Sequence, residues 1–179
     1  MALSDFVLDI WYFAAFAGEV KRGKMRRVTI AGHPVCLGRH KDGRIFALRD
    51  ICPHRAAPLS AGRIVDGQAE CPYHGWKFNT NDGQCTEIPS MCEGQRDPAG
   101  GIKVRSYPAS EDGALIWVYI ASDKNARTLT SPKIKPPQIE IAKLKPRLIE
   151  SLTLNCHVDH AVVGLMDPAH VPFVHNQWW

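Results

Sequence analysis

Three observations in the sequence predict a mainly β domain followed by the beginning of an α+β unit. Short apolar or alternating segments separated by turn residues occupy 28–120, a pattern typical of a small antiparallel β domain. A basic, proline-containing stretch occupies 123–147. Beyond it, a strand-like segment is followed by residues of helical spacing. We therefore divide the chain into 1–122, 123–147 and 148–179.

The strands of the first part are predicted from apolar segments and from the turns between them. Asp66-Gly67 is a two-residue hairpin signal that requires positive φ, and Asn81-Asp82-Gly83 is a further turn. The last two strands are expected to pair with each other around Glu111-Asp112-Gly113. The predicted strands are Val28–Ala31, Val35–Arg39, Ile45–Leu48, Arg63–Val65, Gln68–Glu70, Ile102–Tyr107 and Leu115–Ile120.

The middle stretch accounts for the net charge of +4. The segment from Lys124 to Arg147 contains seven basic residues and only one acidic residue, Glu140. Its four prolines block helix and ladder formation. This composition predicts an extended connector. It contains no interleaved aromatic residues and no nucleic-acid-binding motif, so we expect no nucleic-acid partner.

The third part is predicted to open with a strand over Arg147–Leu154 and to continue with a helix over Val158–Ala169. In the helix, Val162, Leu165 and Met166 have helical spacing, and Pro168 stands near the end.

Composition and the N-terminus predict a globular cytoplasmic protein. Hydrophobic residues make up 45% and charged residues 22%, and no apolar run approaches the roughly 20 residues that span a bilayer. Met1–Asp5 has no basic segment of the kind that opens a signal peptide, so we expect no membrane association. In a reducing compartment the six cysteines are metal ligands or core thiols rather than disulfides.

Two short segments each combine one cysteine with one histidine. Cys52-Pro53-His54 is followed, after 16 intervening residues, by Cys71-Pro72-Tyr73-His74. Two thiolates and two imidazoles suit tetrahedral zinc, or a [2Fe–2S] cluster in which two thiolates hold one iron and two imidazoles the other. A zinc finger normally pairs Cys with Cys and His with His, whereas here each segment supplies one of each.

A second set of metal-binding residue types lies near the C-terminus: Asp167, His170 and His175. On an ideal helix His170 lies about 60° from Asp167, and His175 about 140° from His170, so the imidazoles converge only if the helix distorts. Pro172 supplies a cause for such a distortion. Two histidines and a carboxylate with open positions are the ligands of non-haem Fe(II) oxygenases.

The Cys-x-His and Cys-x-x-His segments look like the Rieske motif. With Asp-x-x-His-x-x-x-x-His about a hundred residues downstream, the chain resembles the Rieske non-haem iron oxygenases, the ring-hydroxylating oxygenase α subunits, of the vanillate and dicamba demethylase type. The resemblance implies a Rieske-type β domain followed by the start of a catalytic domain. It also implies a [2Fe–2S] cluster on Cys52, His54, Cys71 and His74, a mononuclear iron on His170 and His175, and Asp167 as an inter-subunit electron-transfer bridge.

That family resemblance implies the terminal oxygenase component of a multicomponent system. A ferredoxin and/or a flavin reductase would supply electrons from NAD(P)H, and O2 would be activated for hydroxylation, dihydroxylation or demethylation of a small organic, aromatic substrate by a homotrimer. Respiratory Rieske proteins have two further loop cysteines where this chain has Ala57 and Tyr73. The cluster is therefore expected near the low end of the range of about −150 to +300 mV.

Two departures from the family pattern remain. Gly164 stands where many members have asparagine, and the third, carboxylate iron ligand has no counterpart in this chain, which continues for four residues after His175. The sequence therefore predicts a fragment of an oxygenase subunit. A Rieske ferredoxin-like electron carrier without oxygenase activity and a structural zinc module are the alternatives.

Overall fold

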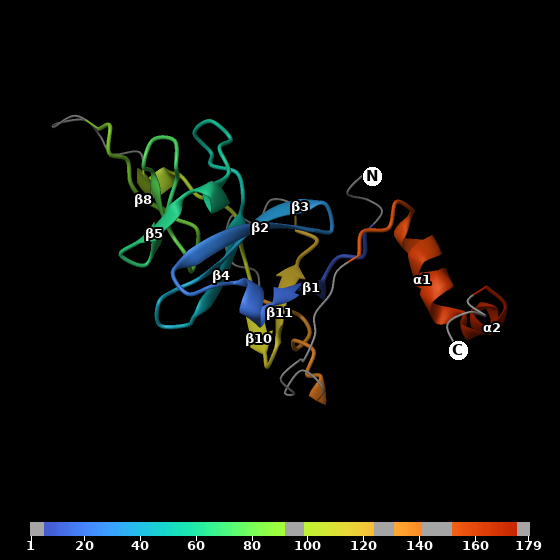
Figure 1. Ribbon diagram of the computed structural model, residues 1–179. Coiled ribbons are helices and arrows are strands. Elements are labelled where there is room, and N and C mark those ends of the chain that lie inside the picture. Colours follow the sequence, from blue (N-terminus) through green and yellow to red (C-terminus); the bar gives the residue numbers. More distant parts are fainter. Residues whose placement is uncertain (1–5, 92–98, 124–130, 141–151, 175–179) are drawn as a thin grey trace. The chain divides into compact units, whose positions relative to one another are not determined.

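The computed structural model describes residues 6–91, 99–123, 131–140 and 152–174 (Figure 1). The chain separates into two compact units, residues 1–146 and 147–179. Each unit is described by itself below.

In the described part of the first unit the strands form three antiparallel sheets. The first sheet has the order β1 (Ile10–Phe16), β11 (Leu115–Ile120), β10 (Ala109–Asp112). The second has the order β2 (Lys24–Ile30), β3 (His33–Arg39), β4 (Ile45–Arg49), β9 (Ser106–Tyr107). The third has the order β5 (Arg63–Val65), β6 (Gln68–Glu70), β7 (Lys77–Asn79), β8 (Cys85–Glu87). Short 3-10 helices cover Ala17–Glu19, Leu59–Ala61 and Ala99–Gly101.

The mainly β prediction is confirmed, and several strands have the expected bounds. β5, β6 and β11 match them, and Asp66-Gly67 adopts φ of 49° and 74° between β5 and β6, as a two-residue hairpin requires.

The predicted pairing of 102–107 with 115–120 is wrong. β11 pairs with β10 and β1, whereas β9 pairs with β4 in the second sheet. Pro108 lies between β9 and β10 and lacks an N–H for a ladder, which accounts for the point at which the chain leaves one sheet for the other. Its carbonyl still accepts a hydrogen bond from the Tyr119 N–H, at 2.9 Å.

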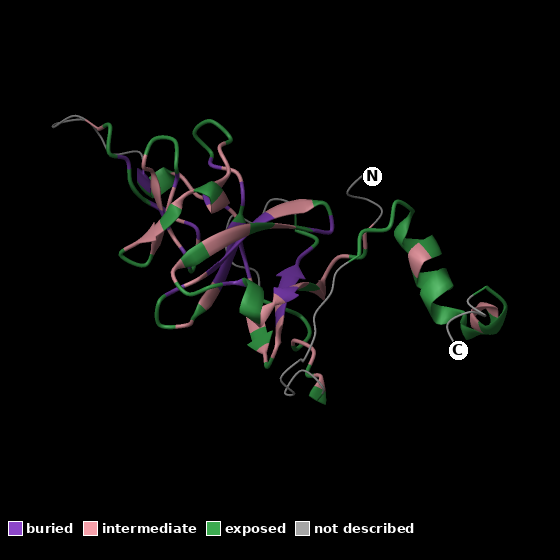
Figure 2. Ribbon diagram, viewed as in Figure 1, coloured by how far each residue is buried: buried purple, intermediate pink, exposed green. Residues whose placement is uncertain are grey.

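The second sheet is the central layer, because its two faces contribute to two different hydrophobic clusters. Cys36 and Leu48 belong to the cluster that includes residues of the third sheet, whereas Val35, Leu37 and Ala47 belong to the one that includes β1 and β11. Alternate residues of a strand point to opposite faces, so burial on both faces requires the continuous apolar segment seen in β3. In Figure 2 the buried residues, in purple, lie in the first unit, whereas the helices of the second unit are exposed or intermediate.

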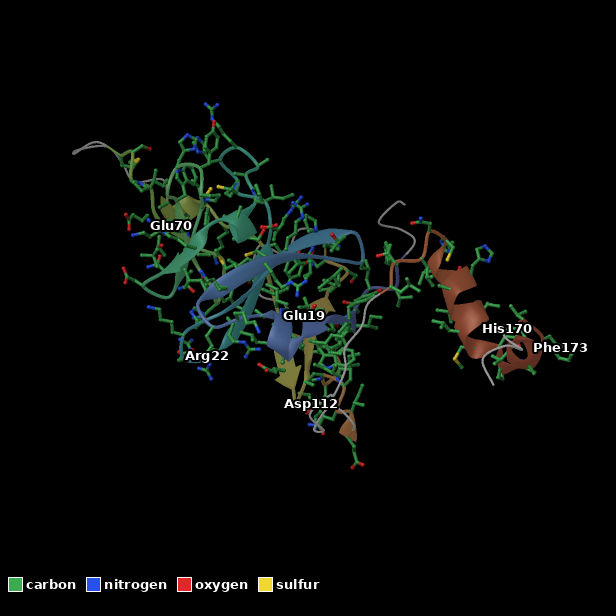
Figure 3. The ribbon with its side chains drawn as sticks, viewed as in Figure 1. Glu19, Arg22, Glu70, Asp112, His170 and Phe173 are labelled. Carbon is green, nitrogen blue, oxygen red and sulfur yellow. The ribbon has the colours of Figure 1, made fainter. Side chains whose placement is uncertain are left out.

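The described part of the connector, residues 131–140, lies along the first sheet. Trp11 Nε1 donates to the Ile134 carbonyl at 2.9 Å, and the Lys133 ammonium pairs with Asp9 at 3.0 Å. The Ile139 N–H donates to Asp112, labelled in Figure 3, at 3.0 Å. These contacts attach 131–140 to the β unit, and the rest of the connector lies outside the described residues.

The second unit contains α1 (Val158–Met166), a 3-10 helix (Pro168–His170) and α2 (Val171–Val174). The helix predicted to reach Ala169 therefore ends three residues earlier. Pro168 disfavours helical geometry in the residue before it, and Asp167 is extended at φ −97° and ψ 94°. Of the strand predicted over 147–154, only 152–154 are described, and they have no regular structure.

In the described residues no helix is long and apolar enough to cross a membrane.

Candidate metal centre

The first ligand-bearing loop follows directly on the central sheet. After β4 ends at Arg49, the chain turns between Cys52 and Ala57. The Cys52 N–H donates to the Ala57 carbonyl at 2.9 Å, and the Ala56 N–H donates to the Cys52 carbonyl at 2.9 Å. Ala56 has a φ of 57°, a left-handed conformation that closes the turn.

The second loop, between β6 and β7, closes in the same way. The Cys71 N–H donates to the Trp76 carbonyl at 2.8 Å, and the Gly75 N–H donates to the Cys71 carbonyl at 3.1 Å. Gly75, at the position that corresponds to Ala56, has a φ of 70°. Two separate segments therefore use one backbone arrangement to present a cysteine at the base and a histidine at the tip.

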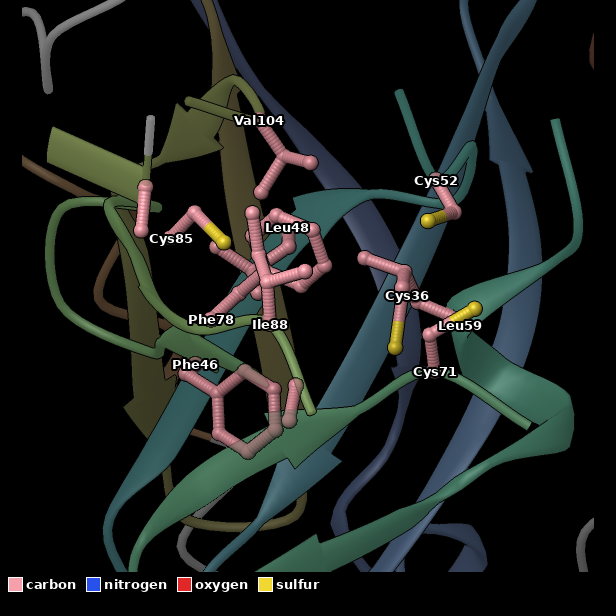
Figure 4. Packing of buried hydrophobic residues seen from close by; sticks show 12 residues of the cluster. Cys36, Phe46, Leu48, Cys52, Leu59, Cys71, Phe78, Cys85, Ile88 and Val104 are labelled. Atoms are coloured by element: carbon pink, nitrogen blue, oxygen red, sulfur yellow. The ribbon is translucent and has the colours of Figure 1, made fainter. Parts of the chain in front are cut away.

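The two thiols are buried together at the base of the loops. Cys52 is 2% exposed and Cys71 is 3% exposed, and in Figure 4 both lie at the edge of the core cluster beside Cys36 and Leu59. Burial raises the pKa of the Cys52 thiol to about 11, with a further contribution from the adjacent Cys71 thiol. The backbone N–H groups of His54 and Arg55 act in the opposite direction, because they stabilise negative charge on the sulfur.

The two imidazoles are exposed and adjacent. The ring centroids of His54 and His74 are 4.6 Å apart, with 58° between the ring planes. Desolvation lowers the pKa of His54, followed by the positive charges of His74 and Arg55. A lowered pKa favours the neutral imidazole, which is the form that binds a metal.

A buried carboxylate fixes the first loop from beneath. Asp50 is 1% exposed, and its two oxygens accept hydrogen bonds from the backbone N–H and the hydroxyl of Ser60, each at 2.7 Å. Its own N–H donates to the Pro34 carbonyl at 2.9 Å. The segment between Asp50 and Ser60, which contains Cys52 and His54, is therefore held at both ends.

The donor set fits an iron–sulfur cluster. The two loops place two buried thiols next to each other and two exposed imidazoles next to each other, which is the pairing that a cluster with two thiolates on one iron and two imidazoles on the other requires. In the described ranges no three His, Cys, Asp or Glu side chains gather around one point to hold a single ion. A two-iron cluster makes no such demand, because each iron takes only two protein ligands.

The second set of predicted ligands is described in part. Asp167 accepts a hydrogen bond from the Ala169 N–H at 2.9 Å, and its other oxygen lies 3.7 Å from His170 Nδ1. Figure 3 labels His170 in this second unit. His175 lies outside the described residues.

Three residues of the site, Asp50, Ser60 and Trp76, were given no role in the sequence analysis. Asp50 and its partner Ser60 carry no spacing signal, because their contact depends on the path of the loop. Trp76, whose indole stacks on His54, stands two residues after a predicted ligand, and that proximity was the only signal available.

Comparison with known proteins agrees with this arrangement. The family model for the Rieske [2Fe-2S] domain matches residues 10–108. The oxygenase component of dicamba O-demethylase from Stenotrophomonas maltophilia is 35% identical over 175 residues, which are 96% of this chain and 48% of that protein. Chloroplastic chlorophyllide a oxygenase from Arabidopsis thaliana is 30% identical over 175 residues, 97% of this chain and 30% of that protein.

A solved structure is also similar. The crystal structure of dicamba monooxygenase bound to 3,6-dichlorosalicylic acid is 37% identical in sequence, with a TM-score of 0.74. The aligned region covers 96% of this chain and 48% of that chain. The chain thus spans less than half the length of these proteins. On the family match and the geometry of the two loops, the chain belongs to the Rieske [2Fe–2S] domain family, and its homologues are Rieske oxygenases.

Proposed function

We propose that this chain is the electron-carrying part, with the beginning of the catalytic domain, of the terminal oxygenase component of a Rieske oxygenase system. Its domains would be 1–122, a connector over 123–147, and 148–179 from the catalytic domain. The observation that carries the proposal is the matched pair of loops, which brings two buried thiols together beneath two adjacent exposed imidazoles.

In this proposal Cys52 and Cys71 hold one iron of a [2Fe–2S] cluster, and His54 and His74 hold the other. When bound, the cluster supplies one-electron transfer. The chain contributes the environment: the N–H groups of His54 and Arg55 stabilise the Cys52 thiolate, and the hydrophobic core excludes water from the sulfur side. The exposed imidazoles leave the nitrogen side open to redox partners.

The second unit would supply part of a mononuclear Fe(II) site. His170 and His175 are the proposed ligands, and the third, carboxylate ligand is not assigned to a residue of this chain. Asp167 faces His170 Nδ1, so we assign Nε2 as the ligand atom. A carboxylate at that position orients the imidazole and serves as the bridge to a cluster histidine of a neighbouring subunit in a homotrimer.

The whole protein would use O2 to hydroxylate, dihydroxylate or demethylate an organic, aromatic substrate. Electrons would reach the cluster from NAD(P)H through a flavin reductase and/or a ferredoxin, in the cytoplasm. The name of the relative from S. maltophilia, a demethylase oxygenase component, supports this class of reaction.

The proposal is tested by loading the chain with iron and sulfide. We expect two iron and two sulfide per chain, and on reduction the EPR signal typical of a Rieske cluster. Cys52→Ser should abolish both, whereas Cys36→Ser should retain them, because Cys36 is an equally buried thiol in β3 that belongs to neither loop. Binding of zinc without sulfide, or an unchanged signal in Cys52→Ser, would overturn the proposal.

The bridge is tested in a holoprotein that contains both metals. Asp167→Asn should leave both metals bound and nearly abolish oxygenation coupled to cluster oxidation. Normal turnover in that variant would contradict the role of Asp167.

A further inference from the structure

Trp76, from the second loop, covers the imidazole that the first loop presents. The indole and the His54 ring are 4.6 Å apart between centroids, and their planes differ by only 4°. His74, by contrast, meets its neighbours at an angle, with 58° to His54 and 44° to Tyr73. We propose that Trp76 is a positioning residue that sets the ring plane of His54 for cluster binding. This inference rests on the proposed function, because it takes His54 as a ligand.

The plane of the ring matters because a metal bound to an imidazole lies close to that plane, along the nitrogen lone pair. His54 stands in an exposed loop, where its side-chain torsions are not restricted by the core. A flat surface parallel to the ring removes most of that freedom before the metal arrives. Preorganisation of this kind is what residues behind a metal ligand contribute.

Trp76 is itself held firmly enough for this task. Its carbonyl accepts the hydrogen bond from the Cys71 N–H, β7 begins at the next residue, and its side chain packs against the hydrophobic core cluster. The indole Nε1 is buried and has no hydrogen-bond partner in the described part of the chain. The ring is therefore held by packing and by its backbone rather than by a polar contact.

Only one of the two histidines is covered by an aromatic ring from the opposite loop. Ala57 occupies the place in the first loop that Trp76 occupies in the second, because each accepts the N–H of its own loop's cysteine. A methyl side chain is too short to cover His74. One histidine is therefore fixed by an aromatic partner from the opposite loop, and the other is not.

Loss of the indole has two physical consequences. The His54 ring gains rotational freedom, which weakens its hold on the iron, and water reaches one face of the ligand. Reduction adds a negative charge to the cluster, and water stabilises that charge, so the reduction potential should rise.

The experiment compares Trp76→Leu, Trp76→Phe and Trp117→Leu in the cluster-loaded chain. Trp117 is a matched control, because it lies in β11 of the first sheet and its indole N–H is also buried without a hydrogen-bond partner among the described residues. The readouts are the EPR spectrum with 15N-labelled histidine, the midpoint potential, and the rate at which a chelator removes iron.

Trp76→Leu should change the histidine nitrogen couplings, raise the potential and release iron several-fold faster. Trp76→Phe, which keeps a flat ring, and Trp117→Leu should resemble the wild type in all three. The inference is overturned if Trp76→Leu matches the wild type, or if Trp117→Leu changes the cluster as much. It is also overturned if Trp76→Phe shifts as far as Trp76→Leu, because the indole N–H would then be the active group.

Failure of the inference is distinguishable from failure of the proposed function. If the wild-type chain shows no Rieske signal, the proposed function fails. If the wild type shows it and Trp76→Leu gives the same couplings, potential and release rate, only the role of Trp76 fails. A thermal melt of each loaded variant identifies unfolding. If Trp76→Leu does not fold, Trp76→Phe still tests the inference, because a flat ring should keep the wild-type couplings, potential and release rate, and a shift in them would contradict it.

Discussion

The left-handed glycine that closes the second ligand loop, Gly75, makes the site sensitive to a single methyl group. A Cβ at Gly75, where φ is 70°, would lie 3.2 Å from Pro89 Cγ. Gly75→Ala should cost about 1–2 kcal/mol through the backbone alone and should also displace His74. Urea unfolding and the iron content of the loaded chain measure the two effects.

Gly67→Ala is the control for that substitution. Gly67 has a φ of 74°, but a Cβ there would meet nothing within 4 Å. It should lose similar stability and keep its full iron content. Equal iron loss in both variants would contradict the assignment of the effect to the loop.

The Asp50 carboxylate beneath the first loop should contribute to stability through its two hydrogen bonds with Ser60. Asp50→Ala removes both hydrogen bonds to Ser60 and leaves the partly buried Ser60 N–H without its acceptor, so it should cost about 3 kcal/mol and loosen the loop. Ser60→Ala removes only the hydroxyl and should cost about half as much. Urea unfolding of the two variants tests the order, and a larger loss in Ser60→Ala would contradict it.

For the two ligand loops, the sequence predicted which types of residue come together but not the contacts between them. The segments with Cys52, His54, Cys71 and His74 were identified from spacing, because the chemistry of metal ligands is restricted to few side chains. The stacking of Trp76 on His54 depends on how closely two loops approach in the folded chain, and no local pattern encodes that distance.

Among the elements, the described part of the connector is attached to the first sheet through a titratable group. Hydrogen bonds from the Ser122 backbone, then the Lys133 side chain, lower the pKa of Asp9 from 3.8 to about 2. A carboxyl whose pKa is lowered in the folded state stabilises that state above its unfolded pKa, and the contribution is lost as the pH falls through the folded pKa. The attachment should therefore weaken between about pH 4 and pH 2.

Trp11 fluorescence reports this change, because its indole donates to the Ile134 carbonyl in the same segment. The chain has other tryptophans, so the measurement is the difference between the wild type and Trp11→Phe. Asp9→Asn should show the low-pH signal already at pH 7. A Trp11 signal that is the same in Asp9→Asn and the wild type at pH 7 would contradict the role of Asp9.

The elements that could be predicted are those with local signals. β5 and β6 were fixed by the Asp66-Gly67 turn, and β11 by its apolar run. β1 was not predicted as a strand, because its pairing with β11 joins residues about a hundred positions apart and leaves no local turn signal. β7 and β8 have three residues each, too few for periodicity to show.

For the molecule as a whole, the two units should differ in independent stability. None of the described residues of the second unit is buried, and α1 has only nine residues, below the roughly 12–15 at which an isolated helix becomes stable. A chain ending at Pro146 should keep the urea midpoint of the β unit, and a peptide of 147–179 should show little helix by circular dichroism. A strongly helical peptide, or a large fall in the midpoint, would contradict this.

The pairing of the first and last long strands bears on how such a unit can be joined to other proteins. Ile10 lies directly opposite Ile120, so the chain enters and leaves the β unit at neighbouring points of one sheet. A segment whose two ends are adjacent can be inserted into a surface loop of a host protein without stretching that host. The β unit from Ile10 to Ile120 therefore has the geometry of a segment that can be transferred as a whole from one protein to another.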